Sequence, residues 1–60
     1  MIWMVAHYEK VSWIDDWMVD FIGIEESAKK MYDELCQQRP NVTYHLFAEV
    51  EAQGAGFVEV

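Results

Sequence analysis

The sequence has 60 residues, which allows a single domain (residues 1–60), and a domain of this size buries only about 60% of its unfolded surface. The net charge is −7 with four basic residues, and this balance excludes the basic surface that direct nucleic-acid binding requires. A hydrophobic fraction of 53% excludes a disordered chain, and no apolar run approaches the roughly 20 residues of a membrane-spanning helix.

The lone cysteine, Cys36, excludes an internal disulfide and fits a reducing compartment. The first residues show neither a basic segment nor a small-residue cleavage site, so we expect no signal peptide. We therefore expect a cytoplasmic protein with no membrane partner. Small domains are usually reinforced by disulfides, metals or oligomerisation, and oligomerisation is the favoured choice here.

Residues 2–10 predict a first strand, because tryptophan, valine and tyrosine favour extended backbone. Side chains alternate between the two faces of a strand. One face would carry Ile2, Met4, Ala6 and Tyr8, and the other Trp3, Val5, His7 and Glu9. Residues 11–16 then connect to the next strand, and the pair Asp15-Asp16 suits a turn.

Residues 17–24 predict a second strand with the same alternation. One face would carry Trp17, Val19 and Phe21, and the other Met18, Asp20 and Ile22. Because Asp20 is charged, its face is expected to be the less buried one. Gly23 suits the exit from the strand.

Residues 25–38 predict an amphipathic helix. Its apolar stripe consists of Ala28, Met31, Tyr32, Leu35 and Cys36. Glu25 and Glu26 lie in the first turn, where the helix dipole favours acidic groups, and Glu25–Lys29 is one of four i,i+4 pairs on the outer face. Pro40 ends the helix because it pushes Arg39 out of helical geometry.

Residues 42–52 predict the longest strand, in which every second residue from Val42 to Val50 is apolar or aromatic. Residues 53–56 read as a turn or a flexible joint. Residues 57–60 predict a possible short fourth strand, which either folds back on its own sheet or pairs with the edge of a neighbouring chain. The expected fold is α+β with the order β-β-α-β. A helix covers one face of a three-stranded antiparallel or mixed sheet, with the third strand beside the first.

One helix can cover only one face of this sheet, and both faces carry large apolar residues. We expect the helix to cover Met4, Ala6, Phe21, Leu46 and Val50. The opposite face would then form an interface or ligand-binding surface made of Trp3, Val5, His7, Met18, Ile22, His45 and Phe47. Such a face is typical of a homodimer or higher oligomer, of a surface that recognises another protein, or of a platform for a small ligand such as a nucleotide.

The two histidines and Asp20 are of the types that bind zinc or iron, but their spacing matches no metal-binding motif, so we expect no cofactor. A second hypothesis is that His7 and His45 make assembly sensitive to pH. Cys36 lies on the apolar stripe without a basic neighbour, and no serine or threonine is placed with a histidine and an acid. We therefore expect a protein that is not an enzyme.

Three segments resemble a family of very small, uncharacterised β-β-α-β domains of phages and bacteria. They are Trp3-Met4-Val5-Ala6-His7-Tyr8, then Phe21-Ile22-Gly23-Ile24 with the acidic helix start Glu25-Glu26-Ser27-Ala28, and Tyr44-His45-Leu46-Phe47-Ala48-Glu49-Val50-Glu51. The resemblance implies no assigned activity and no catalytic residue. It does imply a phage or mobile-element setting, in which small acidic proteins often inhibit host machinery.

The expected function is that of a small, acidic, homo-oligomeric binding protein, an accessory or inhibitor protein of a phage or mobile element, that binds and blocks, or assists, a host or phage protein. The alternative is a protein that binds or sequesters a small ligand, such as a nucleotide, at a junction between protomers. Trp3, His7, His45 and Phe47 would line that junction.

Overall fold

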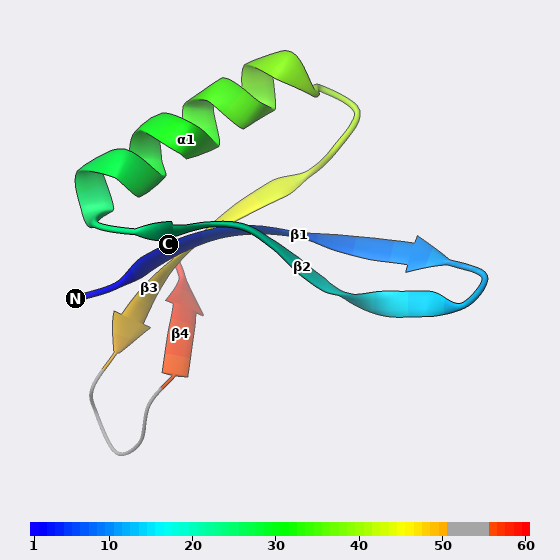
Figure 1. The fold of residues 1–60 in the computed structure, drawn as a ribbon, viewed down its shortest axis with the longest axis horizontal. Helices are drawn as coiled ribbons and strands as arrows, with labels where there is room; N and C mark the ends of the chain where they lie inside the picture. The colour runs from blue at the N-terminus through cyan, green and yellow to red at the C-terminus, as the bar shows by residue number, and fades with distance from the viewer. Residues whose placement is uncertain (51–55) are drawn as a thin grey trace.

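The computed structural model describes residues 1–50 and 56–60. Its elements are β1 (Trp3–Val11), β2 (Ile14–Gly23), α1 (Glu25–Gln38), β3 (Tyr44–Val50) and β4 (Gly56–Glu59). The four strands form one antiparallel sheet in the order β2-β1-β3-β4, and α1 lies along one side of this curled sheet (Figure 1). The α+β class and the position of the third strand beside the first are confirmed. The sheet has four strands rather than three, because β4 pairs with β3 of the same chain.

The hairpin between β1 and β2 turns at Ser12 and Trp13, earlier than the sequence predicts. Asp15 and Asp16 belong to β2, so the prediction of a turn at these two residues is wrong. Asp16 pairs with Glu9, and Val11 pairs with Ile14 next to the turn. Aspartates are tolerated here because β2 is an edge strand whose side chains reach water.

A bulge in β2 breaks the alternation that the sequence predicts for this strand. Val5 pairs with Phe21, but the next residue, Ala6, pairs with Val19, so Asp20 is the extra residue. The extra residue shifts the alternation by one position, so residues before and after the bulge that would share a face lie on opposite faces of the sheet. Phe21 therefore packs towards α1 while Val19 lies on the opposite face, and the prediction that these two share a face is wrong.

The helix begins and ends where the sequence predicts. Among the described residues no side chain caps its first turn, and Ile24 at the N-cap position accepts the first helical hydrogen bond, 2.9 Å from the nitrogen of Ala28. The predicted pair Glu25–Lys29 forms at 2.6 Å. The ammonium of Lys29 also lies 5.2 Å from the centre of the Trp3 ring, which places Trp3 beneath the first turn of the helix.

The core lies between α1 and the sheet, and it reverses the faces predicted for β1. Its buried residues are Trp3, Val5, Ala28, Tyr44 and Ala48, with Phe21, Tyr32, Leu35, Cys36, Val42 and Leu46 packed against them. Trp3 pairs with Ala48 and Val5 pairs with Leu46, and side chains of paired residues project to the same side of a sheet. The helix therefore covers Trp3 and Val5, not Met4 and Ala6 as expected. Phe21 and Leu46 pack against the core as predicted.

Two predictions near the end of the chain lie partly outside the described residues. These are the last two residues of the third predicted strand, 51–52, and the predicted turn at 53–56, of which Gly56 is described and begins β4. Over the described ranges, the structure contains no helix with the length and apolarity needed to cross a membrane.

Candidate functional site

The face of the sheet opposite α1 carries a second cluster of apolar side chains. We call it the open face. Met4 pairs with Phe47 across β1 and β3, and Ala6 pairs with Val19 across β1 and β2. Together with their neighbours these residues line an open hollow of about 280 Å³, which we call the apolar hollow. It is lined by Met4, Ala6, Trp17, Val19, Phe47 and Phe57.

Trp17 covers part of the open face by reaching across β1. The centre of its ring lies 5.4 Å from that of Phe47 and 5.1 Å from that of His45, both in edge-to-face contact. Ala6 lies on the strand between them and is 1% exposed. Because alanine is small, the tryptophan on β2 can touch side chains on β3. Trp17 itself remains 44% exposed, so the cover is incomplete.

Carboxylates border the apolar hollow on β3 and β4. Glu59 lies opposite Phe47, and its carboxylate is 2.6 Å from Nδ1 of His45. Glu49 lies opposite Phe57 and accepts a hydrogen bond of 3.3 Å from the backbone nitrogen of Ile2. The hollow is therefore apolar at its centre and acidic along one side.

Three of the predicted interface residues lie on the open face. Phe47 and His45 contact Trp17 there, and Ile22 pairs with Met4, whose side chain lines the hollow. Trp3 and Val5 are 8% and 0% exposed in the core, so their prediction as surface residues is wrong.

His7 and Met18 also lie off the open face. Met18 pairs with His7, and His7 contacts Tyr44 of the core edge-on with 5.5 Å between ring centres. The bulge explains the division of β2, because Met18 and Ile22 lie on opposite sides of the extra residue, Asp20.

His7 is held between two carboxylates. Its Nδ1 lies 2.7 Å from Oδ2 of Asp20, and its Nε2 lies 3.0 Å from Oε1 of Glu9. The hydrogen bond to Asp20, followed by that to Glu9, raises the pKa of the His7 imidazole above its ordinary value. Because carboxylates only accept hydrogen bonds, both ring nitrogens donate when both bonds form, and the ring is then an imidazolium.

The set of His7, Asp20 and His45, considered from sequence as possible metal ligands, is divided by the sheet. His7 and Asp20 meet on the helix side, whereas His45 contacts Trp17 on the open face. In the part of the chain that the structure describes, no group of three or more histidine, cysteine or acidic side chains is arranged to hold a metal ion.

A second hollow, of about 380 Å³, lies where β3 begins. It is lined by His7, Tyr8, Glu9, Arg39, Asn41, Val42, Thr43 and His45. Among these residues, His7 has both ring nitrogens within hydrogen-bond distance of carboxylates, those of Asp20 and Glu9.

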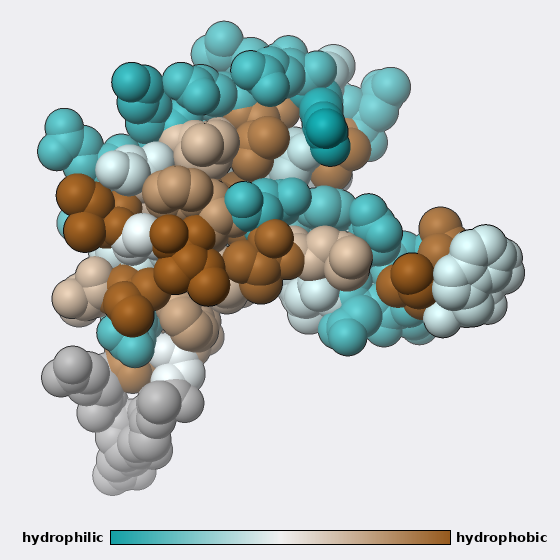
Figure 2. Space-filling view, in the orientation of Figure 1, coloured by the Kyte–Doolittle hydropathy of each residue, from teal (hydrophilic) through white to brown (hydrophobic). Residues whose placement is uncertain are grey.

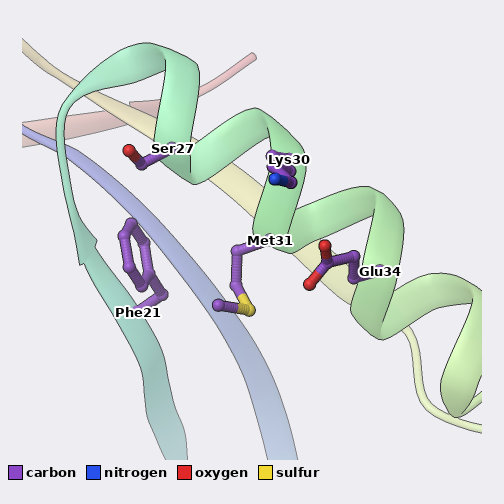
Figure 3. A pocket seen from close by; sticks show the side chains of 5 residues that line it. All are labelled: Phe21, Ser27, Lys30, Met31 and Glu34. Carbon is purple, nitrogen blue, oxygen red and sulfur yellow. The ribbon is translucent and has the colours of Figure 1, made fainter.

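A third hollow, of about 290 Å³, lies between α1 and β2 (Figure 3). The ring of Phe21 and the thioether of Met31 lie between the helix and the strands, while Ser27, Lys30 and Glu34 project from α1 around them. The outer side of α1 is hydrophilic, and hydrophobic residues gather beneath the helix (Figure 2).

Comparison of the chain with models of protein families, with curated proteins and with solved structures gives no match. The function must therefore be argued from the geometry. That geometry adds five lining residues to those expected from the sequence: Met4, Ala6, Trp17, Val19 and Phe57. Ala6, a small residue in a strand of large ones, leaves room for the ring of Trp17 from the neighbouring strand.

Proposed function

We propose that the protein is a non-enzymatic, acidic binding protein that associates with a second copy of itself through the open face. The apolar hollow is the observation that carries this proposal. Among its lining residues Trp17, Val19 and Phe57 are 44%, 54% and 41% exposed. Contiguous apolar side chains on a small soluble chain usually mark a contact site.

The distribution of charge suits a pair of identical chains. Two copies with a net charge of −7 repel each other, so a stable pair must keep its carboxylates at the rim, where salt and water screen them. The centre of the hollow is apolar, and Glu49 and Glu59 lie beside it. In a two-fold pair the open face of each copy meets the open face of the other, and each copy covers the apolar centre of its partner.

The state of His7 supports binding rather than catalysis. A general base needs a free lone pair within reach of the proton that it abstracts. Both nitrogens of His7 face carboxylates at hydrogen-bond distance. We therefore assign the His7 cluster a structural role, joining the bulge of β2 to β1.

We also propose that the pair binds and blocks a host or phage protein, in keeping with the resemblance to small phage and bacterial domains. The acidic surface outside the interface would suit a basic partner. Opposite charges attract less as salt is added, so this contact should weaken at high ionic strength. Self-association through an apolar face should show the opposite trend.

A flat aromatic ligand is the second candidate, because the rings of Trp17 and Phe47 border the same hollow. A ring such as a nucleobase could stack there. The phosphates of a nucleotide would meet Glu49 and Glu59, so an uncharged nucleoside fits better. Titration of tryptophan fluorescence with adenosine and with ATP tests this candidate, and no change with either ligand would remove it.

The test of self-association is solution mass by light scattering. Phe47→Glu places a charge in the apolar hollow and should convert the pair to single chains. Val19→Glu, at a more exposed position on an edge strand, should do the same with less risk to folding. Ile24→Glu is the matched control, because it adds the same charge at a 64% exposed position next to α1.

Circular dichroism would establish that each variant is folded. A wild-type chain that stays monomeric at millimolar concentration would overturn the proposal. So would a pair that Phe47→Glu and Val19→Glu both leave intact.

A further inference from the structure

The hairpin of β1 and β2 extends beyond the rest of the sheet. Pairing of β1 with β3 ends at His7 and Tyr44, whereas pairing of β1 with β2 continues to Val11 and Ile14. Residues 8–17 therefore form a two-stranded projection, which we call the arm and which extends to the right in Figure 1. Among the described residues neither edge of the arm pairs with another strand. A lone two-stranded hairpin is at best marginally stable in water.

The tip of the arm is apolar. Trp13 lies in the turn and is 82% exposed, and Val11 beside it is 49% exposed. A tryptophan so exposed contributes little to the folding of its own chain. Tryptophan is among the residues that contribute most when buried in an interface.

We infer that the arm of each copy reaches across the open face of the other and places Trp13 in the other's apolar hollow. The inference rests on the proposed self-association and names the segment that fills the hollow. An indole ring is apolar on its faces and matches a hollow lined by Trp17, Val19, Phe47 and Phe57.

The dimensions of the chain permit a reciprocal exchange. Ala6 lies at the hollow and Val11 next to the tip, five residues further, which is about 17 Å at a rise of about 3.3 Å per residue. If the two open faces oppose each other with the arms antiparallel, the two-fold axis passes near the middle of this distance. That position is the pair of Tyr8 and Trp17, whose rings contact each other edge-on with 5.4 Å between their centres. The tip of each copy then reaches the hollow of the other copy, so that both hollows are filled.

Charge on the arm favours the same arrangement. Its three carboxylates have partners within the chain: Glu9 contacts His7, Asp15 accepts a hydrogen bond from the Tyr8 hydroxyl, and Asp16 accepts one from the backbone of Trp17. Lys10 is exposed and shares the face of Tyr8 by alternation. It would approach Glu49 and Glu59 at the rim of the other copy's hollow.

The first test is Trp13→Ser, a change at a side chain that contacts little in its own fold. The dissociation constant of the pair, measured by analytical ultracentrifugation, should rise at least about tenfold, which corresponds to a loss of 1.4 kcal/mol. Trp13→Phe should recover part of the affinity. Ile24→Ser, at another exposed apolar position, should leave the dissociation constant unchanged.

The second test is disulfide trapping between two different single-cysteine chains in a Cys36→Ala background. Ser12→Cys places the thiol at the tip, and Val19→Cys places it at the hollow. The mixture of these two chains should form the mixed disulfide, identified by mass. Ser12→Cys mixed with Ser27→Cys, at the groove beside α1, should not.

The outcomes separate this inference from the proposed function. If Phe47→Glu separates the pair but Trp13→Ser leaves the dissociation constant unchanged and no mixed disulfide forms, the arm exchange is wrong and the open-face pair stands. If the wild-type chain is monomeric, both fall. Loss of affinity in Trp13→Ser together with the mixed disulfide supports the exchange.

Discussion

Replacing His7 should remove a stabilising contribution that depends on pH. The carboxylates of Asp20 and Glu9 hold the pKa of His7 above its ordinary value of about 6.5 in the folded protein. A group whose pKa is raised on folding stabilises the fold fully below its unfolded pKa. That contribution is lost as the pH rises through the folded pKa. The wild-type chain should therefore lose stability from about pH 6.5 upwards, and His7→Gln should not show this loss.

The solvent exposure of His7, Asp20 and Glu9 determines how much their contacts contribute to stability. The side chains of His7 and Asp20 are 13% and 19% exposed, whereas that of Glu9 is 41% exposed. Exposed ion pairs contribute about 0–1 kcal/mol, and shielded hydrogen bonds to charged groups about 1.5–3 kcal/mol. The Asp20 contact lies between these limits, so we expect Asp20→Asn to cost about 1–2 kcal/mol at pH 6. Glu9→Gln should cost less than about 1 kcal/mol.

Thermal unfolding followed by circular dichroism at pH 5.5, 6.5, 7.5 and 8.5 measures this contribution. For a chain of this size 1 kcal/mol shifts Tm by about 4–8 °C. The measurements belong in a Phe47→Glu background, so that association does not change with pH. If His7→Gln follows the same pH curve as its parent, the reasoning is refuted.

Two further predictions concern charge and capping. Self-association should strengthen as salt is raised from about 50 to 500 mM, because screening weakens the repulsion between two chains of net charge −7. Sedimentation at both salt concentrations measures the dissociation constant. Weaker association at high salt would indicate an ionic interface instead. Ile24→Ser should stabilise the fold by about 1 kcal/mol, because Ile24 occupies the N-cap position, forms no side-chain hydrogen bond there and is 64% exposed. Thermal unfolding measures this effect. An unchanged or lower Tm would show that the packing of Ile24 contributes more than its exposure suggests.

The helix could be predicted from the sequence because its signals are local. The acidic first turn, the apolar stripe and Pro40 all act within a few residues of one another, and the observed bounds match the predicted ones. The register of β1 against β3 is not local. Alternation separates Trp3 and Val5 from Met4 and Ala6, but only the pairing of Val5 with Leu46 decides which set lies under the helix.

The candidate site shows the same limit. Phe47 and His45 could be placed on the open face because β3 alternates without interruption. Trp17 and Val19 could not be placed on this face, because the bulge at Asp20 reverses the alternation along β2. No residue type in the strand indicates a bulge at that position. The contact of Asp20 with His7 gives the bulge a physical reason, since the extra residue turns its carboxylate to an imidazole on the neighbouring strand.

Folding and association should be linked in a chain with so small a core. Among the residues that the structure describes, the buried side chains are Trp3, Val5, Ala6, Ala28, Tyr44 and Ala48, three of which are alanines. A partner that binds the folded chain alone stabilises it by mass action, so Tm should rise with protein concentration. At a concentration a hundredfold above the dissociation constant, association should add at most about 2.7 kcal/mol, which corresponds to a rise in Tm of up to about 11–22 °C. Phe47→Glu should make Tm independent of concentration, while Ile24→Glu keeps the dependence. A wild-type Tm that stays constant from about 1 μM to 1 mM would mean that the open face contributes nothing to stability through a second copy.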